Sequence, residues 1–155
     1  MKSLILYYSH SGNTRRLAEL IALETGSALL EILPKTAYPQ DYTTVVNQAR
    51  RELQAGFRPA LKTEAPDLAG YDLLFIGTPN WWSSPAPPVA AFLDRAELSG
   101  KRIAPFCTHG GGGSGHIRRD IGALCPGTAV LPELAVYGGD CLESQVRSWL
   151  SRIQA

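Results

Sequence analysis

The chain has 155 residues, of which 45% are hydrophobic and 19% charged, and its formal net charge at pH 7 is +1. This length fits a single domain, residues 1–155, with one sizeable core, and the composition argues against disorder and collagen-like repeats. A nearly neutral chain has no overall field to attract nucleic acid or an anionic membrane, so we expect neither partner.

Short apolar runs alternate with amphipathic segments along the chain. The runs, which are apolar on both faces as in buried parallel strands, lie at residues 4–8, 28–33, 73–77, 103–107 and 129–136. Helical spacing of apolar residues begins at Asn13 and at Asp41 and recurs within residues 89–96, 117–124 and 142–153. Five strands alternating with five helices predict an α/β fold, in which helices cover both faces of a parallel sheet.

The loop after the first strand is rich in hydrogen-bond donors. It reads Ser9-His10-Ser11-Gly12-Asn13-Thr14 and directly precedes a helix, whose N-terminus favours an anion. Simple helix capping is the alternative, but one cap needs only one such residue. The loop lacks both the ending of a nucleotide P-loop and the three-glycine dinucleotide fingerprint. It therefore predicts a phosphate-containing ligand that is bound differently from the way these two motifs bind ATP and NAD.

The loop after the third strand holds two tryptophans, in the segment Thr78-Pro79-Asn80-Trp81-Trp82-Ser83. Ligands of open parallel sheets bind beyond the carboxyl ends of the strands, where large aromatic side chains can form a wall for a planar ring. The alternative is that these side chains pack back onto the core. We expect one tryptophan of each kind, with the sequence leaving open which is which.

The loop after the fourth strand is rich in glycine and includes Thr108-His109-Gly110-Gly111-Gly112. Such a run suggests that the main chain approaches something flat or takes positive φ, and a flexible tether is the alternative. The His-Gly-Gly-Gly segment also mimics an esterase oxyanion hole, but the chain has no Gly-x-Ser-x-Gly nucleophile motif, which excludes that function.

The cysteines predict no disulfide and no metal site. Cys107, Cys125 and Cys141 are odd in number and lack Cys-x-x-Cys or Cys/His ligand spacing. Reduced thiols in the cytoplasm are the simplest interpretation.

The apolar stretches are too short for a membrane span, which needs about 18 apolar residues, and the first apolar run is too short for a signal peptide.

These loops, in this order on a βα chain, resemble the flavodoxin-like FMN-binding proteins. Further segments are similar to a short-chain bacterial subfamily of them: Tyr38-Pro39-Gln40-Asp41-Tyr42, Arg58-Pro59-Ala60-Leu61, Trp81-Trp82 and Pro105-Phe106-Cys107-Thr108. The resemblance implies a three-layer sandwich whose five parallel strands follow the order 2-1-3-4-5. It also implies that residues 9–14 hold the FMN phosphate with neutral donors, and that residues 78–83 and 108–112 border the isoalloxazine.

Two departures from the family bear on function. Ser83 stands where many relatives have a glycine, whose peptide in flavodoxins can turn to stabilise one-electron-reduced flavin, and a serine disfavours the positive φ involved. The three loops also contain no Asp or Glu, whereas flavodoxin electron carriers are acidic. His109 can instead place a donor or a positive charge near the flavin, which would favour two-electron reduction.

These features are compatible with two functions and exclude a third. The first is an FMN oxidoreductase that takes hydride equivalents from NAD(P)H and passes them to a quinone-like or other small acceptor. The second is a non-enzymatic electron carrier that docks on partner proteins, which the same fold and cofactor permit. A phospho-accepting receiver domain is excluded, since it needs acidic residues after the first and third strands.

Overall fold

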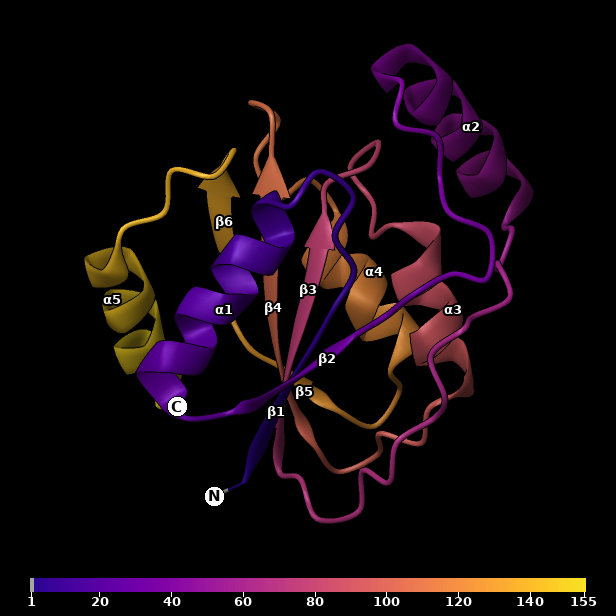
Figure 1. Ribbon diagram of the computed structural model, residues 1–155. Helices are drawn as coiled ribbons and strands as arrows, with labels where there is room; N and C mark the ends of the chain where they lie inside the picture. The colour runs from indigo at the N-terminus through magenta and orange to yellow at the C-terminus, as the bar shows by residue number, and fades with distance from the viewer. Residues whose placement is uncertain (1) are drawn as a thin grey trace.

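The computed structural model describes residues 2–155 and contains one parallel sheet with helices on both faces (Figure 1). The strands are β1 (Ser3–Tyr7), β2 (Ala28–Glu31), β3 (Leu73–Pro79), β4 (Arg102–His109), β5 (Ala129–Val130) and β6 (Leu134–Tyr137). The helices are α1 (Asn13–Thr25), α2 (Tyr42–Ala55), α3 (Pro87–Arg95), α4 (Ile117–Leu124) and α5 (Glu143–Ile153). The strand order β2-β1-β3-β4-β5 confirms the predicted α/β fold and its topology.

The predicted last strand, residues 129–136, is wrong in one respect, because the structure divides it into two. Both parts pair with β4: Ala129 of β5 lies opposite Arg102 near its start, and Leu134 of β6 lies opposite Phe106 further along. Residues 131–133 separate them and include Pro132, which has no N–H to donate to the ladder. The two parts together occupy the fifth position of the sheet.

Side chains alternate between the two faces along each strand, so apolar residues form a core on each face of the sheet. In β1, Leu4 and Leu6 face the core beneath α3 and α4, whereas Ile5 and Tyr7 face the core beneath α1 and α5. Trp149 of α5 is fully buried in the second core. The edge strand β2 departs from the predicted two-sided burial, since Ala28 and Leu29 are exposed.

Residues 34–61, which include α2, leave and rejoin the body of the molecule at adjacent points. Pro34 and Leu61 form an antiparallel bridge, and the N–H of Lys35 donates to the carbonyl of Ala60 at 2.9 Å. Figure 1 shows α2 beyond the carboxyl ends of the strands, apart from the other helices. Asp41 caps α2 by accepting the Thr44 N–H at 2.9 Å.

No helix among residues 2–155 is long and apolar enough to span a membrane.

Candidate functional site

A cleft of about 520 Å³ lies where β1, β3, β4 and β6 end. Each of the three predicted loops contributes to its lining, with His10, Ser11, Asn13, Pro79, Asn80, Trp81, Trp82, Thr108, His109 and Gly110. The remaining lining residues come from α2, from the last residue of β6 and from the residue after it, and they are Tyr42, Val45, Val46, Ala49, Tyr137 and Gly138. The topology therefore brings the predicted loops together, as the carboxyl-edge rule requires.

The loop before α1 is organised by Ser9. Its hydroxyl oxygen accepts the N–H of Gly12 at 3.1 Å and the N–H of Arg15 at 3.2 Å. Gly12 has φ +100°, a left-handed conformation that turns the chain into the helix at little cost for glycine. Because Ser9 satisfies Arg15, the N–H groups of Asn13 and Thr14 remain, and helix geometry gives these two no acceptor within α1. Both N–H groups are available to an anion at the helix N-terminus.

Thr14 joins the first loop to the fourth. Its hydroxyl lies 2.8 Å from that of Thr108, and both side chains are buried. The predicted phosphate role of Thr14 therefore rests on its backbone N–H rather than on its side chain.

His10 turns away from the first loop toward the segment that leads into α2. Its Nε2 lies 2.8 Å from the carbonyl oxygen of Pro39, which can only accept, so Nε2 is the protonated nitrogen. The ring also packs edge-on against Trp81, with centroids 5.8 Å apart. His10 thus connects the loop with the approach to α2.

Thr78 and Asn80 fix the start of the third loop. The hydroxyl of Thr78 accepts the Ala86 N–H at 2.9 Å. The N–H of Asn80 donates to the Thr108 carbonyl at 2.8 Å, and its Nδ2 donates to the Gly113 carbonyl at 2.7 Å. Asn80 therefore ties the third loop to the fourth, and its buried Oδ1 has no hydrogen-bond partner among the described residues.

The two tryptophans have different surroundings. Trp81 is partly buried and packs edge-on against Tyr38 and Tyr8, with centroids 5.0 and 5.6 Å away. Trp82 is 51% exposed, and its indole N–H donates to the carbonyl of Val46 in α2 at 3.0 Å. Trp81 extends the core to the cleft, whereas Trp82 joins the cleft rim to α2.

The turn around Ser83 is held by several backbone contacts. Trp82 and Ser83 have φ of 56° and 63°, and Trp81 and Ser84 exchange backbone hydrogen bonds at 3.1 and 3.2 Å. The carbonyl of Ser83 also accepts the His116 N–H at 2.8 Å. At Gly115 a Cβ would lie 2.7 Å from the Ser83 Cα, so the two backbones are in close contact. The serine does adopt positive φ here, in a turn whose peptide is already bonded.

His109 has its orientation set by its own loop. Its Nδ1 accepts the N–H of Gly111 at 3.0 Å, so in the neutral ring the proton lies on Nε2 and can be donated to a ligand. The ring packs edge-on against Tyr137, with centroids 5.9 Å apart. Gly112 lies beside Asn80, since a Cβ there would be 3.7 Å from Nδ2. His116, by contrast, is exposed and contacts Arg119.

The cleft lining carries no Asp, Glu, Lys or Arg within the described part of the chain. Arg15, near the first loop, is paired with Glu31, and Arg58 is paired with Asp94 at 2.6 Å. Burial raises the pKa of Tyr8 and Tyr38, and Glu52 raises the pKa of Tyr38 further because its carboxylate accepts a hydrogen bond from the Tyr38 hydroxyl. Both phenols are therefore neutral, and the cleft presents uncharged donors and aromatic surface.

Sequence reasoning missed two walls of this cleft. The first is α2, whose apolar residues Tyr42, Val45, Val46 and Ala49 predicted an amphipathic helix without indicating that it lines a cleft. The second is Tyr137, which lies outside the loops after the first, third and fourth strands from which the site was predicted. The rule about carboxyl ends applied equally to the fifth strand position and would have found it.

Comparisons with known proteins agree with this geometry. The family model described as flavodoxin matches residues 2–153. A flavoprotein from Lactobacillus acidophilus, solved in complex with FMN, is 29% identical, with a TM-score of 0.77 over 96% of this chain and 97% of that one. A Bacteroides eggerthii structure assigned as a flavoprotein has a TM-score of 0.87 at 28% identity, over 99% of this chain and 98% of that one.

A curated relative has an enzymatic name. The NAD(P)H dehydrogenase (quinone) of Cupriavidus metallidurans is 34% identical over 95 residues, which are 61% of this chain and 46% of that protein. The alignment thus spans about half the length of this relative.

Proposed function

The chain belongs to the flavodoxin family, and from this premise we propose that it binds FMN and oxidises NAD(P)H to reduce a quinone-like or other small acceptor. The observation that carries the proposal is the uncharged, aromatic-lined cleft beside a phosphate loop built from neutral donors. FMN supplies the redox chemistry when bound, and the chain binds, orients and tunes it.

The residues present fit FMN. The N-terminus of α1 offers the free N–H groups of Asn13 and Thr14 and the hydroxyl of Ser11, which suit a phosphate dianion. Trp82 and Tyr137 give aromatic surface for a planar ring, and Gly110 also belongs to the lining. The binding residues of the proposal remain those of the predicted loops, with Tyr137 and Gly138 added.

His109 supports two-electron chemistry. With Nδ1 occupied by the Gly111 N–H, its Nε2–H is a donor at the cleft, where reduction of the cofactor adds negative charge. No carboxylate among the described residues of the lining opposes that charge. The chain therefore favours a fully reduced cofactor, as a hydride-transferring enzyme requires.

The Ser83 turn supports the same choice over an electron carrier. Its carbonyl is already bonded to the His116 N–H, and Gly115 packs against it. Turning this peptide toward the cofactor would break that bond, so the device that stabilises one-electron-reduced flavin in carriers is disfavoured. The name of the Cupriavidus metallidurans relative also supports a quinone reductase.

Anaerobic titration of the FMN-loaded protein with NADPH, and separately with NADH, tests this proposal. We expect the yellow absorption bands to bleach without long-wavelength radical bands, and to return on addition of a quinone. The carrier is the better description if neither nucleotide reduces the protein while dithionite gives a stable radical. Failure to bind FMN would contradict both functions.

A further inference from the structure

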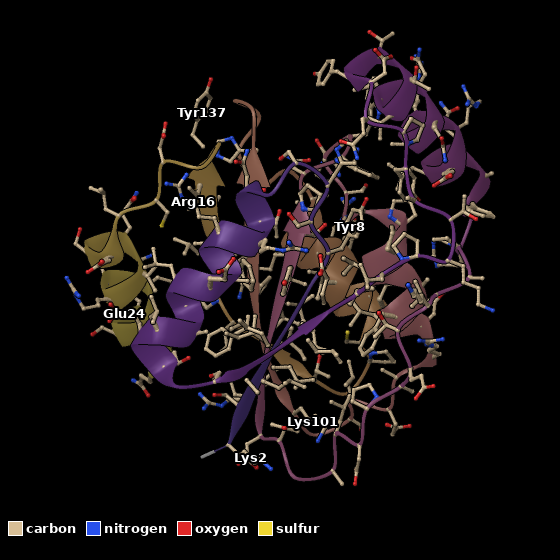
Figure 2. The ribbon with its side chains drawn as sticks, in the orientation of Figure 1. Lys2, Tyr8, Arg16, Glu24, Lys101 and Tyr137 are labelled. Carbon is tan, nitrogen blue, oxygen red and sulfur yellow. The ribbon has the colours of Figure 1, made fainter. Side chains whose placement is uncertain are left out.

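Three exposed aromatic side chains surround the mouth of the cleft. Tyr42 is 79% exposed, Tyr137 is 60% exposed and Trp82 is 51% exposed, and all three belong to its lining. Figure 2 shows Tyr137 projecting outward beyond the end of β6. Exposed aromatic residues scattered singly need no explanation, but a group around one opening marks a binding site.

The α2 wall has an apolar stripe that the core uses only in part. Tyr42, Val45, Val46 and Ala49 lie at positions i, i+3, i+4 and i+7, so they share one face of the helix. Val45 and Ala49 are buried, whereas Val46 is half-buried and Tyr42 is open. The stripe therefore continues from the core into the cleft and leaves its first turn available to a ligand.

This wall is held in place against the predicted cofactor loops. Trp82 donates to the Val46 carbonyl, and the Arg50 guanidinium lies over the Trp82 ring at 5.4 Å. A second link comes from Tyr38, whose hydroxyl donates to Glu52 of α2 and whose ring packs against Trp81. An apolar surface held at a fixed place beside a cofactor site can position a second molecule for reaction.

The two ends of the cleft differ in chemistry. Ser11, Asn13 and His109 give one end its donors, whereas the α2 end offers apolar carbons and aromatic rings. No ionised side chain lines either end within the described residues, which matches an uncharged ligand. The exposed phenol of Tyr42 adds a hydroxyl that can donate to a carbonyl oxygen at the edge of an aromatic ligand.

We propose that Tyr42 and the adjoining α2 stripe form the acceptor-binding wall, and that the acceptor is an uncharged planar quinone. This inference rests on the proposed function. In the overall reaction NAD(P)H loses a hydride and becomes NAD(P)⁺, and the quinone gains that hydride and one proton from solvent to become the hydroquinone. Tyr42 positions the acceptor and takes no part in bond making.

The test compares Tyr42→Ala with Thr43→Ala, a matched change at an exposed neighbour on the same helix turn. For the FMN-loaded Tyr42→Ala protein we expect KM for an uncharged naphthoquinone to rise about tenfold, the loss of one large aromatic contact. Thr43→Ala should stay near the wild-type value. The dissociation constant of FMN should be the same in both variants, and Tyr42→Phe should recover most of the affinity, because it keeps the aromatic face.

Four outcomes would overturn the inference. If Tyr42→Ala weakens FMN binding in parallel, Tyr42 belongs to the cofactor site. If naphthoquinone KM is unchanged, or changes equally in Thr43→Ala, the wall does not bind the acceptor. Should the wild-type protein fail to oxidise NAD(P)H, the proposed function fails separately, and calorimetric binding of naphthoquinone to the oxidised FMN-loaded protein still tests Tyr42. Equal affinity in wild type and Tyr42→Ala would then contradict the inference.

Discussion

Ser9 and Ser11 lie two residues apart in the first loop and have different surroundings. The Ser9 hydroxyl is half-buried and accepts two backbone N–H groups, whereas Ser11 is exposed and has no hydrogen bond to the described residues. Ser9 therefore shapes the loop, and Ser11 remains available to a ligand. A phosphate-binding loop needs both kinds of residue, because donors are useful only when the backbone already holds them in position.

We expect Ser9→Ala to lower the free energy of unfolding of the FMN-free protein by about 1 kcal/mol, as for loss of a helix cap. Ser11→Ala should leave that free energy within about 0.5 kcal/mol of wild type. Both changes should weaken FMN binding. Urea unfolding and fluorescence titration measure the two quantities, and a destabilised Ser11→Ala protein would contradict this division of roles.

Among the elements, α2 depends most on contacts outside the sheet. Only Val45 and Ala49 are buried in it, and Trp82 forms a hydrogen bond that reaches it from the third loop. Elements with few buried apolar contacts open more easily than the rest of a molecule. α2 should therefore open more easily than α1 and α5, each of which has four buried residues, and its opening would expose the cleft.

Trp82→Phe keeps an aromatic ring but removes the N–H that donates to Val46. Loss of this bond costs about 1 kcal/mol, so amide hydrogens of α2 should exchange roughly fivefold faster. The amides of α1 and α5 serve as the internal control, since they pack in the other core. Uniformly faster exchange in all helices would mean that Trp82 supports the whole fold instead.

At the scale of the whole molecule, both buried thiols and several phenols are held neutral. Burial raises the pKa of Cys107 to about 12, with Glu133 adding to the effect, and raises the pKa of Cys125 to about 11. The ordinary value is 9.0. Between these values the unfolded chain releases protons that the folded chain keeps, so stability falls as pH rises.

We therefore expect the free energy of unfolding to decrease steadily from about pH 9 to pH 11. Urea unfolding at a series of pH values measures it, with reducing agent present to keep the thiols free. Cys107→Val retains a small apolar side chain and should make the decline less steep. A free energy of unfolding that stays constant across this range would contradict the assignment.

Sequence reasoning succeeded where local pattern determines structure. Apolar runs located β1 and β3, and the polar loops that follow them were correctly expected at one edge of the sheet. Sequence reasoning failed where the structure depends on which tertiary contacts an element makes. The apolar stripe of α2 has the same sequence pattern whether the helix packs on a sheet or lines a cleft. Only the tertiary structure shows that Tyr42 is exposed. The break at Pro132 did have a local signal, which the apolar run obscured.

The bridge between Pro34 and Leu61 has a consequence for how such proteins diversify. The bridge closes this stretch into a loop, and because loop-closure entropy grows only slowly with length, a change in its length costs little. The loops of the first, third and fourth strands lie outside it. The stretch can therefore be replaced as one unit if Tyr38 keeps its packing against Trp81 and the carbonyl of residue 46 keeps its hydrogen bond from Trp82. Grafting residues 34–61 would replace one wall of the cleft while the rest of the scaffold is inherited unchanged.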